Sequence, residues 1–113
     1  MQRIETTFPC EYLDEIMDVV LALRVPCQMT ASEVRFADGK ISRPSQYRGA
    51  RYVTRWETRA RLEIVVSDKE VESVLGVLVA GLDRDRREDT AVLITEVDDA
   101  LRVRTARRGA LAF

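Results

Sequence analysis

The chain has 113 residues, of which 46% are hydrophobic and 33% charged, and its formal net charge is −1. This balance argues against general nucleic-acid binding, which normally shows a basic footprint. The absence of histidine removes the commonest zinc ligand and the usual proton shuttle near neutral pH. No apolar run approaches the roughly 18 residues needed to cross a membrane, and the start has no apolar signal core. We therefore expect one cytoplasmic domain over residues 1–113, without a metal site or membrane insertion.

The first half of the chain predicts a strand, a helix, a strand and a loop. Residues 2–8 are typical of a strand. Residues 11–24 carry apolar side chains at helical spacing, and Pro26 ends this predicted helix. Residues 29–36 predict a second strand. Residues 37–50 hold two glycines and a proline but few core-type side chains. We expect a long exposed loop there, which in a small domain is usually functional or disordered.

The third strand, predicted over residues 52–66, has two different faces. One face consists of Trp56, Thr58, Ala60, Leu62, Ile64 and Val66, and the other of Arg55, Glu57, Arg59, Arg61 and Glu63. This alternation indicates a strand that turns its first face to a core. Helices cover only one face of the sheet expected below, so the charged face must meet water, a ligand or another subunit.

A second helix and two further segments follow the third strand. Ser67 and Glu70 have the spacing of a capping box, and the apolar stripe after them predicts a helix. Residues 83–89 predict a charged turn, 91–97 a buried-type strand and 100–105 a short extended piece. The order strand, helix, strand, strand, helix, strand predicts an α+β fold of the ferredoxin-like βαββαβ type. Its sheet is mostly antiparallel, with the helices on one face.

Four arginines on predicted strands indicate a possible anion site. Arg102 and Arg104 alternate with apolar residues, so we expect them to share a face. They could converge with Arg59 and Arg61 if their strands approach each other, within or between subunits, and Glu63 could orient Arg59 or Arg61. Guanidinium groups donate planar pairs of hydrogen bonds, which suit a phosphate or a carboxylate. The alternative interpretation is a solvated sheet face with cross-strand Arg–Glu pairs.

The two cysteines are expected to be free thiols. Cys10 and Cys27 lack the spacing of a metal-binding pair. The helix between them would place them at opposite ends of the sheet, beyond the reach of a disulfide.

Four separated segments of the sequence resemble one known family. MTASEV at 29–34, YRGARY at 47–52, RLEIVVSD at 61–68 and LRVRT at 101–105 are similar to motifs of the PII signal-transduction proteins. The resemblance covers almost the whole chain in the same element order. It implies a non-catalytic homotrimer of ferredoxin-like subunits that binds ATP or ADP in the clefts between subunits. A long T-loop, which residues 37–53 match, would dock on enzymes, transporters or transcription factors.

The resemblance also implies roles for single residues on the predicted strands. Thr30 matches a threonine near the adenine. Arg59 stands where the family has a phosphate-binding lysine, and Glu63 matches a glutamate that can pair with that lysine. Arg102 and Arg104 match two C-terminal arginines that reach the phosphates.

In the loop, the resemblance points to four further residues. Lys40 stands at the position of a ligand-contacting glutamine. Tyr47 and Tyr52 match the T-loop tyrosines, and Tyr52 matches the one that some enterobacterial relatives have uridylylated. Together with Arg48, these tyrosines are the expected contacts to a partner protein, although such tyrosines are more often plain surface or packing residues.

The segment that matches the family's B-loop, about 83–91, departs from the family pattern. Where the family has Gly-Asp-Gly-Lys, this chain has Glu88, Asp89, Thr90 and Ala91. The glycines that permit close backbone approach and the phosphate-binding lysine are both lost. We therefore favour ADP or AMP over ATP as the bound nucleotide. In having an altered B-loop, this chain is similar to the PII-like proteins that are associated with carboxysome and bicarbonate-transporter genes. That similarity implies bicarbonate as a co-effector and a transporter, enzyme or carboxysome-related target.

Other interpretations stay open at this point. The chain could be a nitrogen-regulatory PII protein, or a docking module that has lost its effector. An enzyme is disfavoured because the sequence offers no nucleophile–base pair and no metal cluster. The C-terminal segment 106–113 is either a disordered tail or a clasp over the cleft, and the sequence does not decide between the two.

Overall fold

The computed structural model describes residues 1–37, 56–83 and 90–113. Within these residues, strands and helices follow one another in the order β1, α1, β2, β3, α2, β4. The strands are β1 (Gln2–Phe8), β2 (Cys27–Phe36), β3 (Glu57–Val66) and β4 (Val92–Glu96), and the helices are α1 (Leu13–Leu21) and α2 (Val71–Leu82). Short 3-10 helices lie at Cys10–Tyr12, Asp68–Glu70 and Gly109–Ala112.

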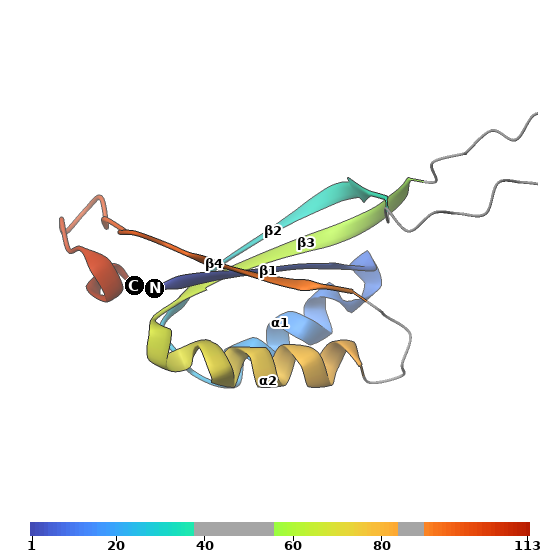
Figure 1. Ribbon diagram of the computed structural model, residues 1–113, viewed down its shortest axis with the longest axis horizontal. Coiled ribbons are helices and arrows are strands. Elements are labelled where there is room, and N and C mark those ends of the chain that lie inside the picture. The colour runs from blue at the N-terminus through green and yellow to red at the C-terminus, as the bar shows by residue number, and fades with distance from the viewer. Residues whose placement is uncertain (38–55, 84–89) are drawn as a thin grey trace, which may run out of the picture.

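The four strands form an antiparallel sheet in the order β2-β3-β1-β4, and both helices pack on the same face of it (Figure 1). The expected ferredoxin-like α+β fold is therefore confirmed. The helices leave the other face open. In the described parts of the chain, no helix is long and apolar enough to span a membrane.

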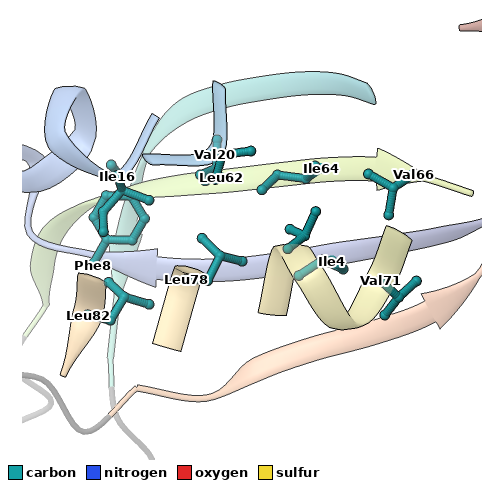
Figure 2. Close-up of a cluster of buried hydrophobic side chains, with 12 residues drawn as sticks. Ile4, Phe8, Ile16, Val20, Leu62, Ile64, Val66, Val71, Leu78 and Leu82 are labelled. Atoms are coloured by element: carbon teal, nitrogen blue, oxygen red, sulfur yellow. The ribbon is translucent and has the colours of Figure 1, made fainter. Parts of the chain in front are cut away.

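The core lies between the sheet and the helices, and β1, β3, α1 and α2 contribute its buried apolar residues, at alternate or helically spaced positions (Figure 2). Ile64 and Leu62 of β3 are completely buried, as are Ile4 and Phe8 of β1. The period of two on the strands and of 3.6 on the helices places these side chains on the facing surfaces. The helices contribute Ile16, Val20, Val71, Val74, Leu78 and Leu82.

The expected core face of the third strand is right only for its second half. Ala60 to Val66 bury their inward side chains, but Thr58 is exposed and Trp56, which precedes the strand, is 58% exposed. The cause is the register, because Ala60 pairs with Phe8, the last residue of β1. Before Ala60, β3 has only β2 beside it. Residues 52–55, which were also expected in this strand, lie outside the described part of the chain.

Several predicted boundaries and one predicted cap differ from the structure. The first helix is shorter than 11–24, since a 3-10 turn precedes it and Arg24 adopts a left-handed backbone (φ 54°) before Pro26. The capping box is wrong. The Ser67 side chain makes no capping hydrogen bond, and instead its backbone carbonyl accepts from the Glu70 N–H at 3.0 Å in a 3-10 turn.

The last two predicted segments also need correction. β4 is not a buried-type strand, because it is an edge strand bonded only to β1, and Leu93 and Ile94 are 55% and 46% exposed. Residues 100–105 are not an extended piece, since the chain turns at 103–105 and Leu101 pairs with Arg108. The alternation expected to place Arg102 and Arg104 on one strand face therefore does not apply.

Candidate functional site

The charged residues of β3 lie on the open face of the sheet, in rows set by the strand register. Glu63 stands between Thr30 of β2 and Glu5 of β1. One row further along, Arg61 stands between Ser32 and Thr7, and the next row places Arg59 opposite Val34. Directly opposed residues of an antiparallel sheet point to the same side. The open face therefore gathers Arg59, Arg61 and Glu63, as the alternation of the third strand predicted, and Thr30 of β2 lies beside them.

Arg61 is the partner of Glu63 in this structure. Its Nη2 donates to the Glu63 carboxylate at 2.6 Å, while its Nε lies 3.7 Å from the Glu5 carboxylate, beyond hydrogen-bond length. Glu5 and Glu63 are directly opposite each other on the neighbouring strands β1 and β3, an arrangement that is unfavourable for like charges. The Arg61 guanidinium between them offsets this repulsion. Of the two possibilities left open for Glu63, orientation of Arg61 is the one seen.

Arg59 is held by a different set of contacts near the end of the sheet. Its Nε donates to Glu57 at 3.1 Å, and its guanidinium lies 4.8 Å from the centre of the Phe36 ring. The Arg59 side chain is only 14% exposed. A cation over an aromatic face is attracted to the ring's electrons, most strongly where water is displaced. The orientation of Arg59 is thus set before any ligand binds.

Arg102 and Arg104 lie at the opposite end of the molecule. β4 ends beside Gln2, which pairs with Val66, and the chain continues past that end of the sheet (Figure 1). Arg59 is seven residues before Val66, or about 23 Å at roughly 3.3 Å per strand residue. One subunit alone therefore does not bring Arg102 beside Arg59. Arg102 Nε instead donates to the backbone carbonyl of Ala112 at 2.6 Å, and Arg104 is exposed in the turn.

The remaining predicted residues of the loop lie outside the described part of the chain. They are Lys40, Tyr47, Arg48 and Tyr52, with all of the expected T-loop except Ala37. Of the segment matching the B-loop, Asp83, Thr90 and Ala91 are described. The Thr90 hydroxyl donates to the Thr7 carbonyl at 2.7 Å, and the Ala91 carbonyl accepts from the Thr6 hydroxyl at 3.1 Å. These two bonds fasten the end of that segment to β1.

Sequence reasoning missed two groups that contact the predicted arginines. Phe36 was assigned only to a strand, yet its ring stacks against Arg59. Once Val34 is known to pair with Arg59, Phe36 follows as a same-face neighbour two residues away. The Ala112 carbonyl at Arg102 carries no side-chain signal, so no sequence pattern could have found it.

Both cysteines are free, at opposite ends of the sheet as expected. Cys10 follows β1 beyond Phe8, whereas Cys27 pairs with Val66 at the other end. Burial raises the pKa of the Cys27 thiol. Cys27 is therefore protonated and weakly nucleophilic at neutral pH.

No protein-family model matches the chain, but full-length relatives do. It is 28% identical over 109 residues to a nitrogen regulatory protein P-II of Cereibacter sphaeroides, covering 96% of both chains. It is 29% identical over 110 residues to nitrogen regulatory protein P-II 2 of Methanothermobacter thermautotrophicus, covering 96% of this chain and 94% of that one.

Two solved structures share the fold over nearly the whole chain. One is a B. subtilis GlnK–ATP complex, with a TM-score of 0.81, 20% identity and coverage of 99% of this chain and 96% of the other. The other is Arabidopsis thaliana PII bound to citrate, with a TM-score of 0.76, 22% identity and coverage of 99% and 91%.

Proposed function

Because the chain belongs to the PII family, we propose that it is a non-catalytic, cytoplasmic regulatory protein that assembles as a homotrimer and binds an adenine nucleotide between subunits. Its relatives are named as nitrogen regulatory proteins. The B. subtilis GlnK of the same fold forms a complex with ATP, which supports a nucleotide as the effector of this chain as well.

The observation that carries this proposal is the pre-oriented guanidinium of Arg59. It is stacked on Phe36, bonded to Glu57 and largely buried. A planar guanidinium with a fixed orientation loses little conformational entropy when it binds a phosphate in bidentate fashion. Glu57 is 61% exposed, so its contact with Arg59 is weakened by solvent and open to displacement by a phosphate. Arg59 keeps the positive charge of the family's phosphate-binding lysine.

The placement of the C-terminal arginines supports a site between subunits. Arg102 and Arg104 lie at the far end of the sheet from Arg59, so the three can hold one ligand only if a second copy contributes. Leu93 and Ile94 on the edge strand are exposed and provide apolar surface for that assembly. Thr30 on the open face is assigned to the adenine end of the site, and Glu63, opposite it in the same row, is assigned to orienting the arginine that it bonds, Arg61.

The hydrogen bonds at the end of the B-loop segment, together with its changed residues, favour the proposal that the site binds ADP or AMP rather than ATP. Thr90 stands at the position of a family glycine, and its hydroxyl is already bonded to Thr7. Ala91 replaces the family's phosphate-binding lysine. The terminal phosphate of ATP would lack that lysine as a counter-charge, whereas AMP and ADP ask less of this segment.

In this proposal, binding of the effector changes the loop 37–53 and so alters the affinity of the protein for its partner. Phe36 precedes this loop and Trp56 follows it, and each lies against an arginine, Arg59 and Arg35 respectively. A phosphate that moves Arg59 would therefore shift the base of the loop, where Lys40, Tyr47, Arg48 and Tyr52 are assigned to ligand and partner. Bicarbonate is the co-effector in this proposal, held by arginines near an incomplete phosphate site. The partner is a transporter, an enzyme or a carboxysome-related protein.

Calorimetric titration of the purified protein with AMP, ADP and ATP, each with and without bicarbonate, tests the proposal. We expect ADP or AMP to bind more tightly than ATP, and bicarbonate to strengthen binding. Arg59→Ala and Arg102→Ala should each weaken binding by about tenfold or more, the loss of a charge-assisted hydrogen bond. Lys69→Ala removes an exposed charge in the 3-10 turn between β3 and α2 and serves as the matched control.

Each other outcome would favour an interpretation left open by the sequence. ATP binding that is tighter than ADP or AMP binding and indifferent to bicarbonate would favour a nitrogen-regulatory protein. Absence of binding by any nucleotide, in a protein that melts cooperatively, would indicate a docking module without an effector.

A further inference from the structure

The side chain of Arg102 is occupied by the chain's own C-terminal turn. Its Nε donates to the Ala112 carbonyl at 2.6 Å, and Ala112 is only 6% exposed. This contact points Arg102 back toward the terminus of its own subunit. In the proposed site Arg102 must reach across to a neighbouring subunit.

The turn that presents Ala112 is a built structure rather than a loose end. Asp99 accepts hydrogen bonds from the backbone N–H of Ala100 at 2.8 Å and of Gly109 at 3.2 Å, and it also pairs with Arg108. Gly109 has a left-handed backbone (φ 64°), which a residue without Cβ adopts without strain. It sends the chain into the 3-10 helix Gly109–Ala112.

The same turn leaves apolar surface uncovered. Leu101, Val103 and Leu111 are 60%, 94% and 70% exposed. Burial of such side chains is favourable, so a rearrangement that packs them elsewhere would be stabilised. The arrangement of the turn in a single subunit is thus one that a neighbouring subunit or a ligand can displace.

We propose that residues 110–113 are an autoinhibitory clasp that competes with the nucleotide for Arg102. The inference rests on the proposed function and adds a regulatory contact to the same site. A phosphate is charged and the Ala112 carbonyl is neutral, so the phosphate forms the stronger hydrogen bond with the guanidinium. The nucleotide therefore displaces the clasp, but its apparent affinity is lowered by the fraction of subunits in which the clasp is closed.

The test is calorimetric titration of ADP into the full chain and into a chain that ends at Gly109. The truncated chain keeps Asp99, Arg108 and their bonds. We expect it to bind ADP about three- to tenfold more tightly, the gain expected from removing one competing hydrogen bond. Because a truncated chain can assemble poorly, the full-length variant Ala112→Lys is measured in parallel. A lysine cannot occupy the buried position of Ala112, so this variant should show the same gain. Val79→Ala, which shortens an exposed apolar side chain on α2 outside the turn, should bind as the full chain does.

In the Arg102→Ala background, the truncation should change nothing, because the contested group is gone. Equal affinity of the full and truncated chains would overturn the clasp and leave nucleotide binding intact. Weaker binding by the truncated chain would overturn it as well, since the tail would then position Arg102 for the ligand. If neither chain binds any nucleotide, the proposed function fails and the clasp fails with it.

Discussion

A single side chain, Phe36, does much to determine how Arg59 meets a ligand. The ring lies 4.8 Å from the guanidinium and precedes the loop assigned to the partner. An exposed arginine samples many rotamers, and ordering it on binding costs free energy. The stack with Phe36 limits this cost, because it fixes Arg59 beforehand.

Replacing Phe36 by Leu should therefore weaken binding of ADP by about three- to tenfold, with a smaller effect on adenosine, because only the phosphate contact depends on the orientation of Arg59. Phe36→Tyr keeps an aromatic face and should bind like the parent chain. The measurement is a set of titrations with adenosine, AMP and ADP. An equal loss for all three ligands would indicate a general distortion and contradict the positioning role.

For single residues, the sequence predicted which charged side chains form the site, but it did not predict how these side chains are oriented toward one another. The alternation of β3 was enough to put Arg59, Arg61 and Glu63 on one face. It could not decide which arginine Glu63 would take, since that depends on rotamers and on Glu5, a residue of a strand far away in the sequence. It also could not reveal the Ala112 carbonyl, because every residue carries the same backbone group.

At the scale of elements, helix α2 contains two glycines with opposite surroundings. A Cβ at Gly76 would meet nothing within 4 Å, whereas a Cβ at Gly81 would lie 2.8 Å from Cδ1 of Ile16. Ile16 is 1% exposed, so it has little room to move. Gly81 thus allows α1 and α2 to approach each other closely, and Gly76 has no such packing role in one subunit.

Gly76→Ala should stabilise the protein by about 0.5–1 kcal/mol, because alanine loses less backbone entropy on entering a helix. Gly81→Ala should gain less or be destabilising, since the added methyl group must displace Ile16. Urea denaturation of both variants at one protein concentration measures the difference. An equal stabilisation by the two substitutions would show that Ile16 of α1 can move aside at little cost in free energy.

The C-terminal turn is another element whose stability depends on one residue, Asp99. The hydrogen bond from Arg108, followed by the Ala100 N–H, holds the pKa of the Asp99 carboxyl below its usual 3.8. A lowered pKa means that the contribution of Asp99 is fully present above pH 3.8 and is lost as the pH falls through the lowered value. At neutral pH the turn keeps this contribution in full.

Asp99→Asn should accordingly open the turn at neutral pH, because asparagine cannot form the charged pair with Arg108. We expect the amide of Gly109 to exchange its hydrogen several-fold faster in the variant, as measured by NMR at constant pH. Asp98→Asn removes the same charge one residue earlier and should leave this amide unchanged. An identical rate in both variants would mean that the backbone bond from Gly109 to Ala100 holds the turn by itself.

At the scale of the whole molecule, the order of the strands could be predicted but the surroundings of the edges could not. Hydrophobic periodicity gave four strands and two helices in the right order. The sequence predicted a buried strand at β4 because Val92, Leu93 and Ile94 are consecutive apolar residues. In the isolated subunit this strand is an edge, with Leu93 and Ile94 substantially exposed. An apolar sequence predicts that such a strand is buried, but it does not predict whether the strand is covered by its own subunit or by another one.

The separation of Arg59 from Arg102 leads to the sharpest test of assembly. If each site takes Arg59 from one subunit and Arg102 from the next, then Arg59→Ala and Arg102→Ala each damage every site in their own homotrimers. When the two variants are co-assembled in equal amounts, a site is intact if its Arg59 comes from the Arg102→Ala chain and its Arg102 from the Arg59→Ala chain. Random assembly restores about a quarter of the sites.

Titration of the mixed assemblies with ADP should therefore recover tight binding at about one site in four, with the affinity of the parent protein. A mixture of Arg59→Ala with the double variant Arg59→Ala/Arg102→Ala is the control, and it should recover none, because neither chain supplies Arg59. If the Arg59→Ala and Arg102→Ala mixture also recovers none, although both chains are present in the same particles, the two arginines do not form a shared site. Arg102 would then act within its own subunit, at the C-terminal turn where its side chain bonds the Ala112 carbonyl.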